Sequence, residues 1–160
     1  MFKVGVVGCG HLGKIHLKLL NQSESFDLIG VYDNDINISK KAASEFGCKS
    51  YESFEEMIAE IDVLDIVTPT PSHFRYALKA IENGVHIFIE KPVCSNTEES
   101  LKLIEKSKLN NVKIQVGHVE RFNPAFTAVE NNISKPMFIE SHRLAQFNPR
   151  GNDVSVVLDL

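Results

Sequence analysis

The residues best suited to chemistry near the start of the chain are three glycines, spaced as G-x-G-x-x-G at Gly8, Gly10 and Gly13. An apolar run precedes them and an apolar helical pattern follows, so the expected order is strand, tight turn and helix. The first glycine permits the sharp turn, the second lets the backbone approach a pyrophosphate, and the third lets helix and strand pack closely. The amides at the helix start, with His11 and Leu12, then face the phosphates of a dinucleotide.

An acidic residue stands where a dinucleotide site needs one. The second expected strand ends at Asp33, about 20 residues after Gly13, where a carboxylate can accept hydrogen bonds from both hydroxyls of the adenosine ribose. The same carboxylate repels a 2′-phosphate and Asn34 offers no compensating cation, so the expected cofactor is NAD rather than NADP. The alternative is that the glycines only form a turn and Asp33 only caps a loop.

Two later segments carry polar side chains at the ends of expected strands. Thr68, Pro69 and His73 follow the fourth strand, where hydroxyl and backbone groups can touch the nicotinamide ribose. Alternatively this segment is a proline-bounded turn whose Ser72 caps a helix, and both interpretations can hold together.

The segment Glu90-Lys91-Pro92 ends the fifth expected strand. A charged pair at the end of a buried strand is costly unless it is used or exposed. Lys91 can orient a substrate hydroxyl and assist its proton transfer. The alternative is a solvated salt bridge between Glu90 and Lys91.

Strand and helix patterns alternate up to the sixth strand. After the first helix, whose apolar face is expected at Leu12, Ile15, Leu19 and Leu20, the expected helices cover 34–46, 53–61, 72–83 and 97–108, and the later strands 48–51, 62–68, 85–89 and 112–116. This order predicts an α/β fold with a doubly wound parallel (Rossmann) sheet, its ligand over the carboxyl ends of the strands. The alternating pattern of 112–116 places the sixth strand at a sheet edge.

The composition is that of an ordinary globular chain, with 43% hydrophobic and 24% charged residues. The formal net charge of −4 and the lack of a basic run argue against nucleic acid as a partner. Cys9, Cys48 and Cys94 form no C-x-x-C pair, so no metal site is expected. No apolar run approaches the roughly 18 residues of a membrane span and no signal region opens the chain, so we expect a cytoplasmic protein without membrane contact.

These segments together resemble the Gfo/Idh/MocA family of NAD(P)-dependent oxidoreductases, and the resemblance covers all 160 residues. The residues that carry it are Gly8, Gly10, Gly13, Thr68, Pro69, His73 and above all Glu90-Lys91-Pro92. In that family a dinucleotide domain precedes an α/β substrate domain with an open antiparallel sheet. The resemblance implies that Lys91 is catalytic beside nicotinamide and substrate, that Glu90 belongs to the cofactor site, and that Pro92 shapes the turn as a cis peptide.

A narrower resemblance covers 117–124 and 149–154, which are similar to members acting on nucleotide sugars, of the bacterial UDP-N-acetylglucosamine 3-dehydrogenase type. It implies hydride transfer between nicotinamide and a secondary hydroxyl of a sugar or nucleotide sugar. By that likeness Arg121, Asn123 and Pro124 line the cleft, with Arg121 and Asn123 toward the substrate. The alternative is a structural linker between domains.

The pattern changes after Gly117, with a short helix expected over 123–132 and a strand over 136–145. We expect residues 1–122 to form the NAD-binding domain and 123–160 to be the incomplete start of an α+β substrate and oligomerisation domain. The full-length protein is expected to form a homo-oligomer. The family's catalytic histidine lies four residues after an aspartate that matches Asp159, so it falls past the end of this chain, which is expected to bind cofactor without turnover.

Two other functions are compatible with a glycine-rich first turn. One is a non-catalytic NAD(H)-binding sensor or regulator, against which Glu90-Lys91-Pro92 argues. The other is an S-adenosylmethionine methyltransferase, against which the third glycine, spaced for helix packing, argues. Thermal-shift comparison of NADH with S-adenosylmethionine discriminates the second alternative.

Overall fold

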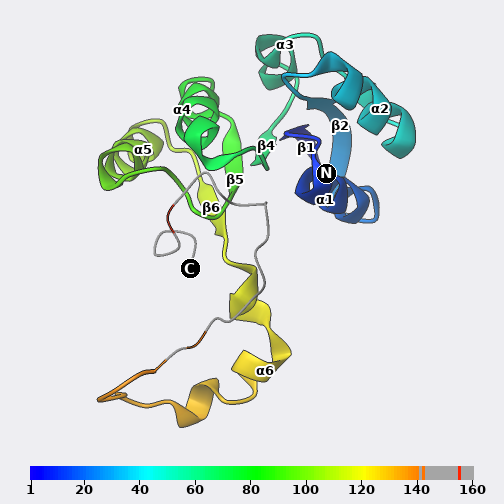
Figure 1. The fold of residues 1–160 in the computed structure, drawn as a ribbon. Helices are drawn as coiled ribbons and strands as arrows, with labels where there is room; N and C mark the ends of the chain where they lie inside the picture. The colour runs from blue at the N-terminus through cyan, green and yellow to red at the C-terminus, as the bar shows by residue number, and fades with distance from the viewer. Residues whose placement is uncertain (141, 143–154, 156–160) are drawn as a thin grey trace.

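The computed structural model describes residues 1–140, 142 and 155, and its centre is a six-stranded parallel sheet (Figure 1). The strands are β1 (Phe2–Val7), β2 (Phe26–Tyr32), β3 (Lys49–Ser50), β4 (Val63–Ile66), β5 (His86–Glu90) and β6 (Ile114–Gly117). Their order in the sheet is β3-β2-β1-β4-β5-β6, which confirms the doubly wound α/β prediction and the edge position of β6. The order reverses between β1 and β4, so the ligand crevice of this sheet lies above their carboxyl ends.

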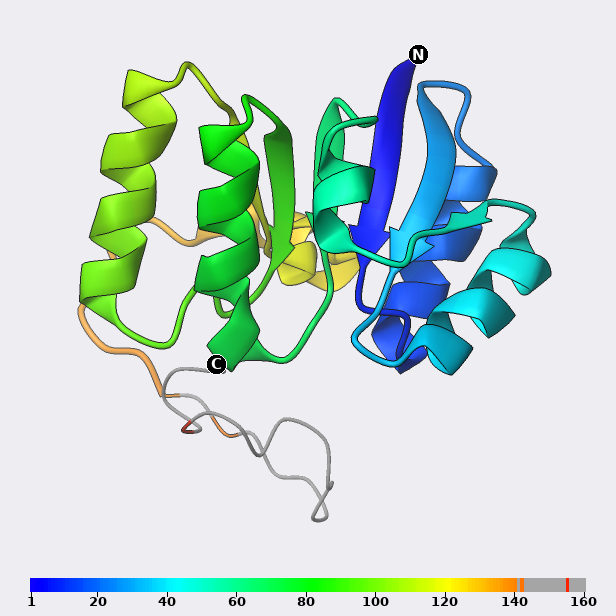
Figure 2. The same cartoon turned by 90° about the horizontal axis from the view of Figure 1, so that it is seen from above.

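Helices cover the sheet on both faces (Figure 2). The helices are α1 (His11–Asn21), α2 (Ile36–Phe46), α3 (Phe54–Ile58), α4 (His73–Glu82) and α5 (Thr97–Leu109), with the short 3₁₀ turn η1 (Thr70–Ser72) before α4. The views show α3, α4 and α5 on one face, and α1 and α2 on the other over β1 and β2.

Each face of the sheet has its own apolar core. The larger core joins strand residues such as Leu64, Ile66 and Ile89 to α3, α4 and α5. The smaller core joins Val6 and Val31 to α1 and α2. Because a strand's side chains alternate between faces, Val6 and Val7 of β1 lie in different cores. This two-sided burial fixes the strands whose ends carry the polar residues.

Short-range side-chain bonds set the starts of three helices. Asp35, Ser53 and Asn96 each accept a backbone N–H from the first turn of the helix they precede, at α2, α3 and α5. At Ser53 the hydroxyl accepts the Glu56 N–H at 3.2 Å. The first helix differs, because its N-cap is Gly10, which has no side chain to cap it.

The predicted apolar face of α1 is confirmed only at Leu20, which is partly buried against the smaller core. Leu12, Ile15 and Leu19 are exposed, and the fully buried residues of the helix are Gly13 and Leu17. The reason is geometric: Gly13 must lie against the first turn, and that contact rotates the helix so that residues four apart from Gly13 face the core. Apolar spacing alone does not reveal this constraint.

The chain beyond β6 departs further from expectation. After the 3₁₀ turn η2 (Val119–Phe122), the helix expected over 123–132 is divided into α6 (Pro124–Thr127) and the 3₁₀ turn η3 (Glu130–Asn132). The strand expected over 136–145 is absent from residues 136–140 and 142, and its other residues lie outside the described part. Met137 and Phe138 are largely exposed, and no described segment pairs with them, so the backbone bonds that define a strand are missing there. No helix in the described residues has the length and apolar character to cross a membrane.

Candidate functional site

The glycine turn between β1 and α1 is packed at two of its glycines and open at the third. Gly8 has φ +96°, and a Cβ there would lie 2.6 Å from the Val67 carbonyl oxygen. A Cβ on Gly13 would lie 2.0 Å from the Gly8 carbonyl oxygen. A Cβ on Gly10 would meet nothing within 4 Å, so the space over that residue is open to a ligand.

Among the described residues, no side chain caps the start of α1. Gly10 gives no side-chain cap, and the first turn, which contains His11 and Leu12, has no acidic residue. His11 and Leu12 are exposed at this end of the helix. The unsatisfied N–H groups and the positive end of the helix dipole suit an anion such as a pyrophosphate.

Asp33 lies just after β2, and its carboxylate is tied to the glycine turn. One oxygen accepts the Cys9 N–H at 2.8 Å, and the other accepts the Asp35 N–H at 3.0 Å. Each carboxylate oxygen can accept a further bond, so the pair stays able to receive ribose hydroxyls. Sequence reasoning missed the bond to Cys9, which joins the ends of β1 and β2.

A cavity of about 170 Å³ lies at the carboxyl ends of β1, β2 and β4. Its lining includes Gly8, Gly10, Asp33, Asn34, Thr68, Pro69, Ser72 and Tyr76. The structure therefore brings together predicted residues from three separate segments of the sequence. The cavity stands at the switch point of the sheet, where ligands of such folds bind.

The segment after β4 is organised by Ser72 in a way the sequence did not predict. Ser72 stands at the N-cap of α4 but makes no capping bond. Its hydroxyl instead lies 2.7 Å from Thr68 Oγ1 and 2.8 Å from the Pro69 carbonyl oxygen. The capping interpretation was wrong, because the 3₁₀ turn η1 turns this side chain back onto the loop it follows.

His73 links the loop after β4 to the turn after β5. Its Nε2 lies 2.7 Å from the Thr68 carbonyl oxygen and its Nδ1 2.9 Å from the Pro92 carbonyl oxygen. The ring is 1% exposed. His73 thus acts within the described residues as a buried tie that fixes Thr68 relative to the Lys91–Pro92 peptide bond, which is cis as the family resemblance implied.

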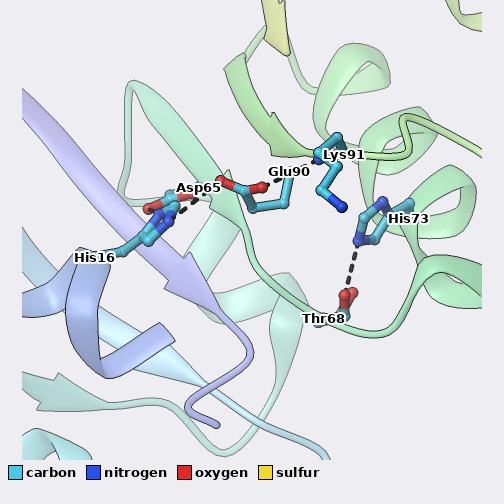
Figure 3. A network of polar contacts seen from close by, with 6 residues as sticks. All are labelled: His16, Asp65, Thr68, His73, Glu90 and Lys91. Carbon is cyan, nitrogen blue, oxygen red and sulfur yellow. Dashed lines mark hydrogen bonds and ion pairs between the residues drawn. The ribbon is translucent and has the colours of Figure 1, made fainter. Parts of the chain in front are cut away.

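Lys91 follows the last residue of β5. Figure 3 shows its side chain directed toward Thr68 and His73, of which Thr68 lines the cavity at the glycine turn. The preceding Glu90 is directed the other way, toward His16 and Asp65. The side chains of Glu90 and Lys91 therefore have different surroundings. The alternative prediction of a solvated salt bridge between them did not include this difference.

Glu90 belongs to a cluster of three ionisable groups, of which Asp65 is buried and His16 and Glu90 are partly buried. His16 Nδ1 lies 2.9 Å from Asp65 Oδ2, and His16 Nε2 lies 3.4 Å from Glu90 Oε1. Burial raises the pKa of Asp65, although the His16 bond opposes this. Burial also acts to raise the pKa of Glu90, but hydrogen bonds from His16 and the Lys91 amide outweigh it and lower that pKa.

Sequence reasoning missed both His16 and Asp65 as members of a cluster. The signal was present at Asp65, because a carboxylate in the middle of an apolar strand needs a buried partner. His16 could not be chosen as that partner from sequence, since 49 residues separate the two.

The residues expected toward the substrate lie on the segment that leaves β6. Arg121, in η2, is exposed and lines a cavity of about 390 Å³ with His118, Glu120 and Phe126. Asn123 caps α6 by accepting the Ala125 N–H and donates to Glu120 Oε2 at 2.7 Å. Both belong to local contacts of this segment, and neither lines the cavity at the glycine turn. Asp159 lies outside the described residues.

Sequence and structure comparisons both find similar proteins among known dehydrogenases. The chain is 36% identical over 159 residues to UDP-N-acetylglucosamine 3-dehydrogenase of Acidithiobacillus ferrooxidans, covering 99% of this chain and 50% of that protein. The solved structure of that enzyme superposes with a TM-score of 0.90 at 35% identity, over 99% of this chain and 52% of the other. GenD2 from gentamicin A biosynthesis, solved in complex with NAD, gives a TM-score of 0.79 at 25% identity, over 82% of this chain and 38% of the other. The chain spans about half the length of the curated relatives it matches.

The described residues fit the NAD of such proteins. The open space over Gly10, the uncapped start of α1 and the carboxylate of Asp33 suit its pyrophosphate and adenosine ribose. The family model for oxidoreductases with an NAD-binding Rossmann fold matches residues 2–118, from β1 through the end of β6. The chain therefore belongs to the Gfo/Idh/MocA family of oxidoreductases, through a domain with that family's NAD-binding Rossmann fold.

Proposed function

We propose that this chain is the cofactor-binding and lysine-bearing part of an NAD-dependent dehydrogenase acting on a secondary hydroxyl of a sugar or nucleotide sugar. The observation that carries the proposal is the arrangement of Lys91, whose side chain points to the Thr68–His73 side of the strand ends beside the glycine-turn cavity. The substrate class rests on the relatives, which include the UDP-N-acetylglucosamine 3-dehydrogenase and a scyllo-inositol 2-dehydrogenase of Bacillus subtilis.

Each cofactor contact is assigned to a described residue. The backbone at Gly8, Gly10 and Gly13, with the first amides of α1 at His11 and Leu12, would hold the pyrophosphate. Asp33 would accept the hydroxyls of the adenosine ribose. Thr68 and Pro69 would border the nicotinamide ribose, and His73 would keep that loop at a fixed distance from Lys91 through its two carbonyl contacts.

Lys91 would act on the reacting hydroxyl. The bound nicotinamide supplies the hydride acceptor. The Lys91 ammonium would donate a hydrogen bond to the substrate hydroxyl oxygen and stabilise the negative charge that develops as its proton leaves. The resemblance assigns the proton acceptor to a histidine four residues after the position of Asp159.

The division of the chain follows from the same reasoning. Residues 1–122 would form the NAD-binding domain, and 123–160 would begin the substrate and oligomerisation domain, with Arg121 and Asn123 on the substrate side. We therefore expect the 160-residue chain to bind NADH, measured by calorimetry, and to leave nucleotide-sugar-dependent NAD reduction at background. Loss of a general base alone removes about 10²–10⁴-fold of rate.

The decisive test of Lys91 uses a chain extended to the length of its relatives. Lys91→Ala should lower kcat by about 10²–10⁴-fold and leave the Kd for NADH within about twofold. Lys108→Ala, on the far end of α5, is the matched control and should change neither quantity. Unchanged turnover in Lys91→Ala removes the lysine from the chemistry. NADH binding without turnover of any sugar by the extended wild type would favour a sensor.

A further inference from the structure

The imidazole ring of His16 lies beside the carboxylates of Asp65 and Glu90, near the end of β5 (Figure 3). His16 comes from α1, Asp65 from β4 and Glu90 from β5, and their side chains are 14%, 6% and 14% exposed. Neither His16 nor Asp65 lines the cavity at the glycine turn. The proposed chemistry therefore leaves unexplained why three ionisable groups meet here.

The geometry selects the charged form of His16. Nδ1 hydrogen-bonds Asp65 and Nε2 lies within ion-pair distance of Glu90, so a ring protonated on both nitrogens has an acidic partner on each side. Burial alone lowers the pKa of His16, but its bonds to Asp65 and Glu90 outweigh burial and raise the pKa to about 9. Near neutral pH an imidazolium thus joins the two carboxylates.

Both oxygens of Glu90 are engaged. Oε1 faces His16, and Oε2 accepts the backbone N–H of Lys91 at 3.2 Å. The opposite position on β6 is Gly117, paired with Glu90 in the sheet, where a Cβ would come 2.6 Å from Oε1. The carboxylate therefore occupies space that any other residue at 117 would need.

This arrangement gives Glu90 a cation, His16, that comes from another element of the fold. A partly buried carboxylate without His16 would seek the nearest cation, and Lys91 is the next residue along the chain. With His16 in place, Glu90 turns toward α1 and the Lys91 side chain turns toward Thr68 and His73. The bond from the Lys91 amide to Glu90 fixes the backbone from which that side chain leaves.

We propose that His16 and Asp65 are positioning residues that hold the Glu90 carboxylate, and through it set the backbone and side-chain direction of Lys91. Asp65 holds the imidazolium against Glu90, and its second oxygen, Oδ1, is buried without a hydrogen-bond partner in the described residues. Burying this carboxylate costs free energy, and we infer that its function is to orient the His16 ring. The catalytic consequence rests on the proposed function of Lys91, but the positioning does not.

The test removes His16 and Asp65 together, so that Glu90 keeps only its bond to the Lys91 amide and the nearby Lys91 ammonium. His16→Leu alone strands two carboxylates and is expected to unfold the protein, whereas His16→Leu with Asp65→Leu replaces an ion pair by apolar side chains, a change that is often neutral or stabilising. The control is His86→Gln, at the other end of β5, where the ring accepts the Lys113 N–H at 3.1 Å. Thermal unfolding of both variants verifies that the fold is kept.

The first readout is hydrogen exchange at the Lys91 backbone N–H, measured by NMR in the 160-residue chain. We expect exchange at least about tenfold faster in the double variant, with Ile89 unchanged and no effect of His86→Gln. Lys91 exchange that stays at the wild-type rate overturns the inference, whatever role Lys91 has.

The second readout is turnover in a chain of full family length. The double variant should lower kcat by at least about tenfold while the KM for NAD stays within about twofold, because the cofactor contacts remain. Wild-type kcat in the double variant, with kcat lost in Lys91→Met, overturns the inference and keeps the proposed function. Wild-type kcat in Lys91→Met overturns the proposed function, and the exchange result then decides the positioning alone. Both readouts are taken at one pH, because His16 and Asp65 form the ionisable cluster with Glu90.

Discussion

Two glycines of the same turn should fail in different ways when each is replaced by alanine. At Gly13 the new Cβ would lie 2.0 Å from the Gly8 carbonyl oxygen, against a favourable separation of about 3.5 Å. That oxygen is backbone, so α1 and the turn must move apart by roughly 1.5 Å. Overpacking of this kind costs about 1–3 kcal/mol, which corresponds to a fall in Tm of roughly 2–12 °C in a domain of this size.

Gly10→Ala should leave the fold intact and weaken the binding of the cofactor. The new Cβ meets no protein atom within 4 Å, and φ is −68°, which alanine adopts without strain. The methyl group instead occupies the space over the turn through which a pyrophosphate approaches. We expect stability within about 0.5 kcal/mol of wild type and an NADH Kd raised by at least about tenfold.

Urea unfolding followed by circular dichroism, with NADH titration by calorimetry, separates the two cases. Gly84→Ala is a control for loss of glycine alone, because it has φ +73° and open space around it, far from the cavity. It should cost stability without changing the NADH Kd. Equal destabilisation by Gly10→Ala and Gly13→Ala, or wild-type NADH affinity in Gly10→Ala, would refute this account of the turn.

Three further outcomes are expected. The double substitution Asp33→Ser and Asn34→Arg should lower the affinity for NADH and raise the affinity for NADPH, each by at least about tenfold in calorimetry. A wild-type protein that binds the two cofactors equally well contradicts the role of Asp33. Because the pKa of His16 is raised from 6.5 to about 9, its stabilisation should be complete below pH 6.5 and decline as pH rises through 9, by on the order of 3 kcal/mol. Urea unfolding from pH 6 to 10 measures this loss of stability. If the free energy of unfolding falls with pH equally in the His16→Leu/Asp65→Leu variant, the pH dependence comes from another group. Burial and the nearby Asp33 raise the pKa of the Cys9 thiol to about 12, so Cys9 should resist iodoacetamide at pH 8 until urea unfolds the chain, as peptide mass mapping can follow.

The sheet could be predicted because each strand and helix has an apolar pattern contained within a short stretch of sequence. The glycines, Asp33 and the segment at Lys91 follow predicted strands, and parallel strands bring such ends to one edge. The capping bond at Ser53 was predictable for the same reason, since its partner lies three residues away.

The contacts that could not be predicted join distant parts of the chain. His16 meets Asp65 across 49 residues, and Asp33 reaches back to Cys9 across 24. The exposed side of α1 was also misjudged, because the close approach of Gly13 to Gly8 outweighs the apolar spacing of the helix. The strand expected after residue 135 was wrong over 136–140 because a strand depends on a neighbour that sequence pattern alone cannot supply.

The pairing of Glu90 with Gly117 also bears on how this protein can vary. A Cβ at 117 would lie 2.6 Å from Glu90 Oε1, so while Glu90 is present a larger residue there forces its carboxylate to shift from its place beside His16. Substitutions at the two sites are therefore ordered: a change at 117 becomes tolerable after Glu90 has been lost, and the reverse order passes through a damaged intermediate. Among related sequences, we expect a larger residue at the position of Gly117 only where the position of Glu90 holds a shorter one. A deep mutational scan in both backgrounds would measure this epistasis directly.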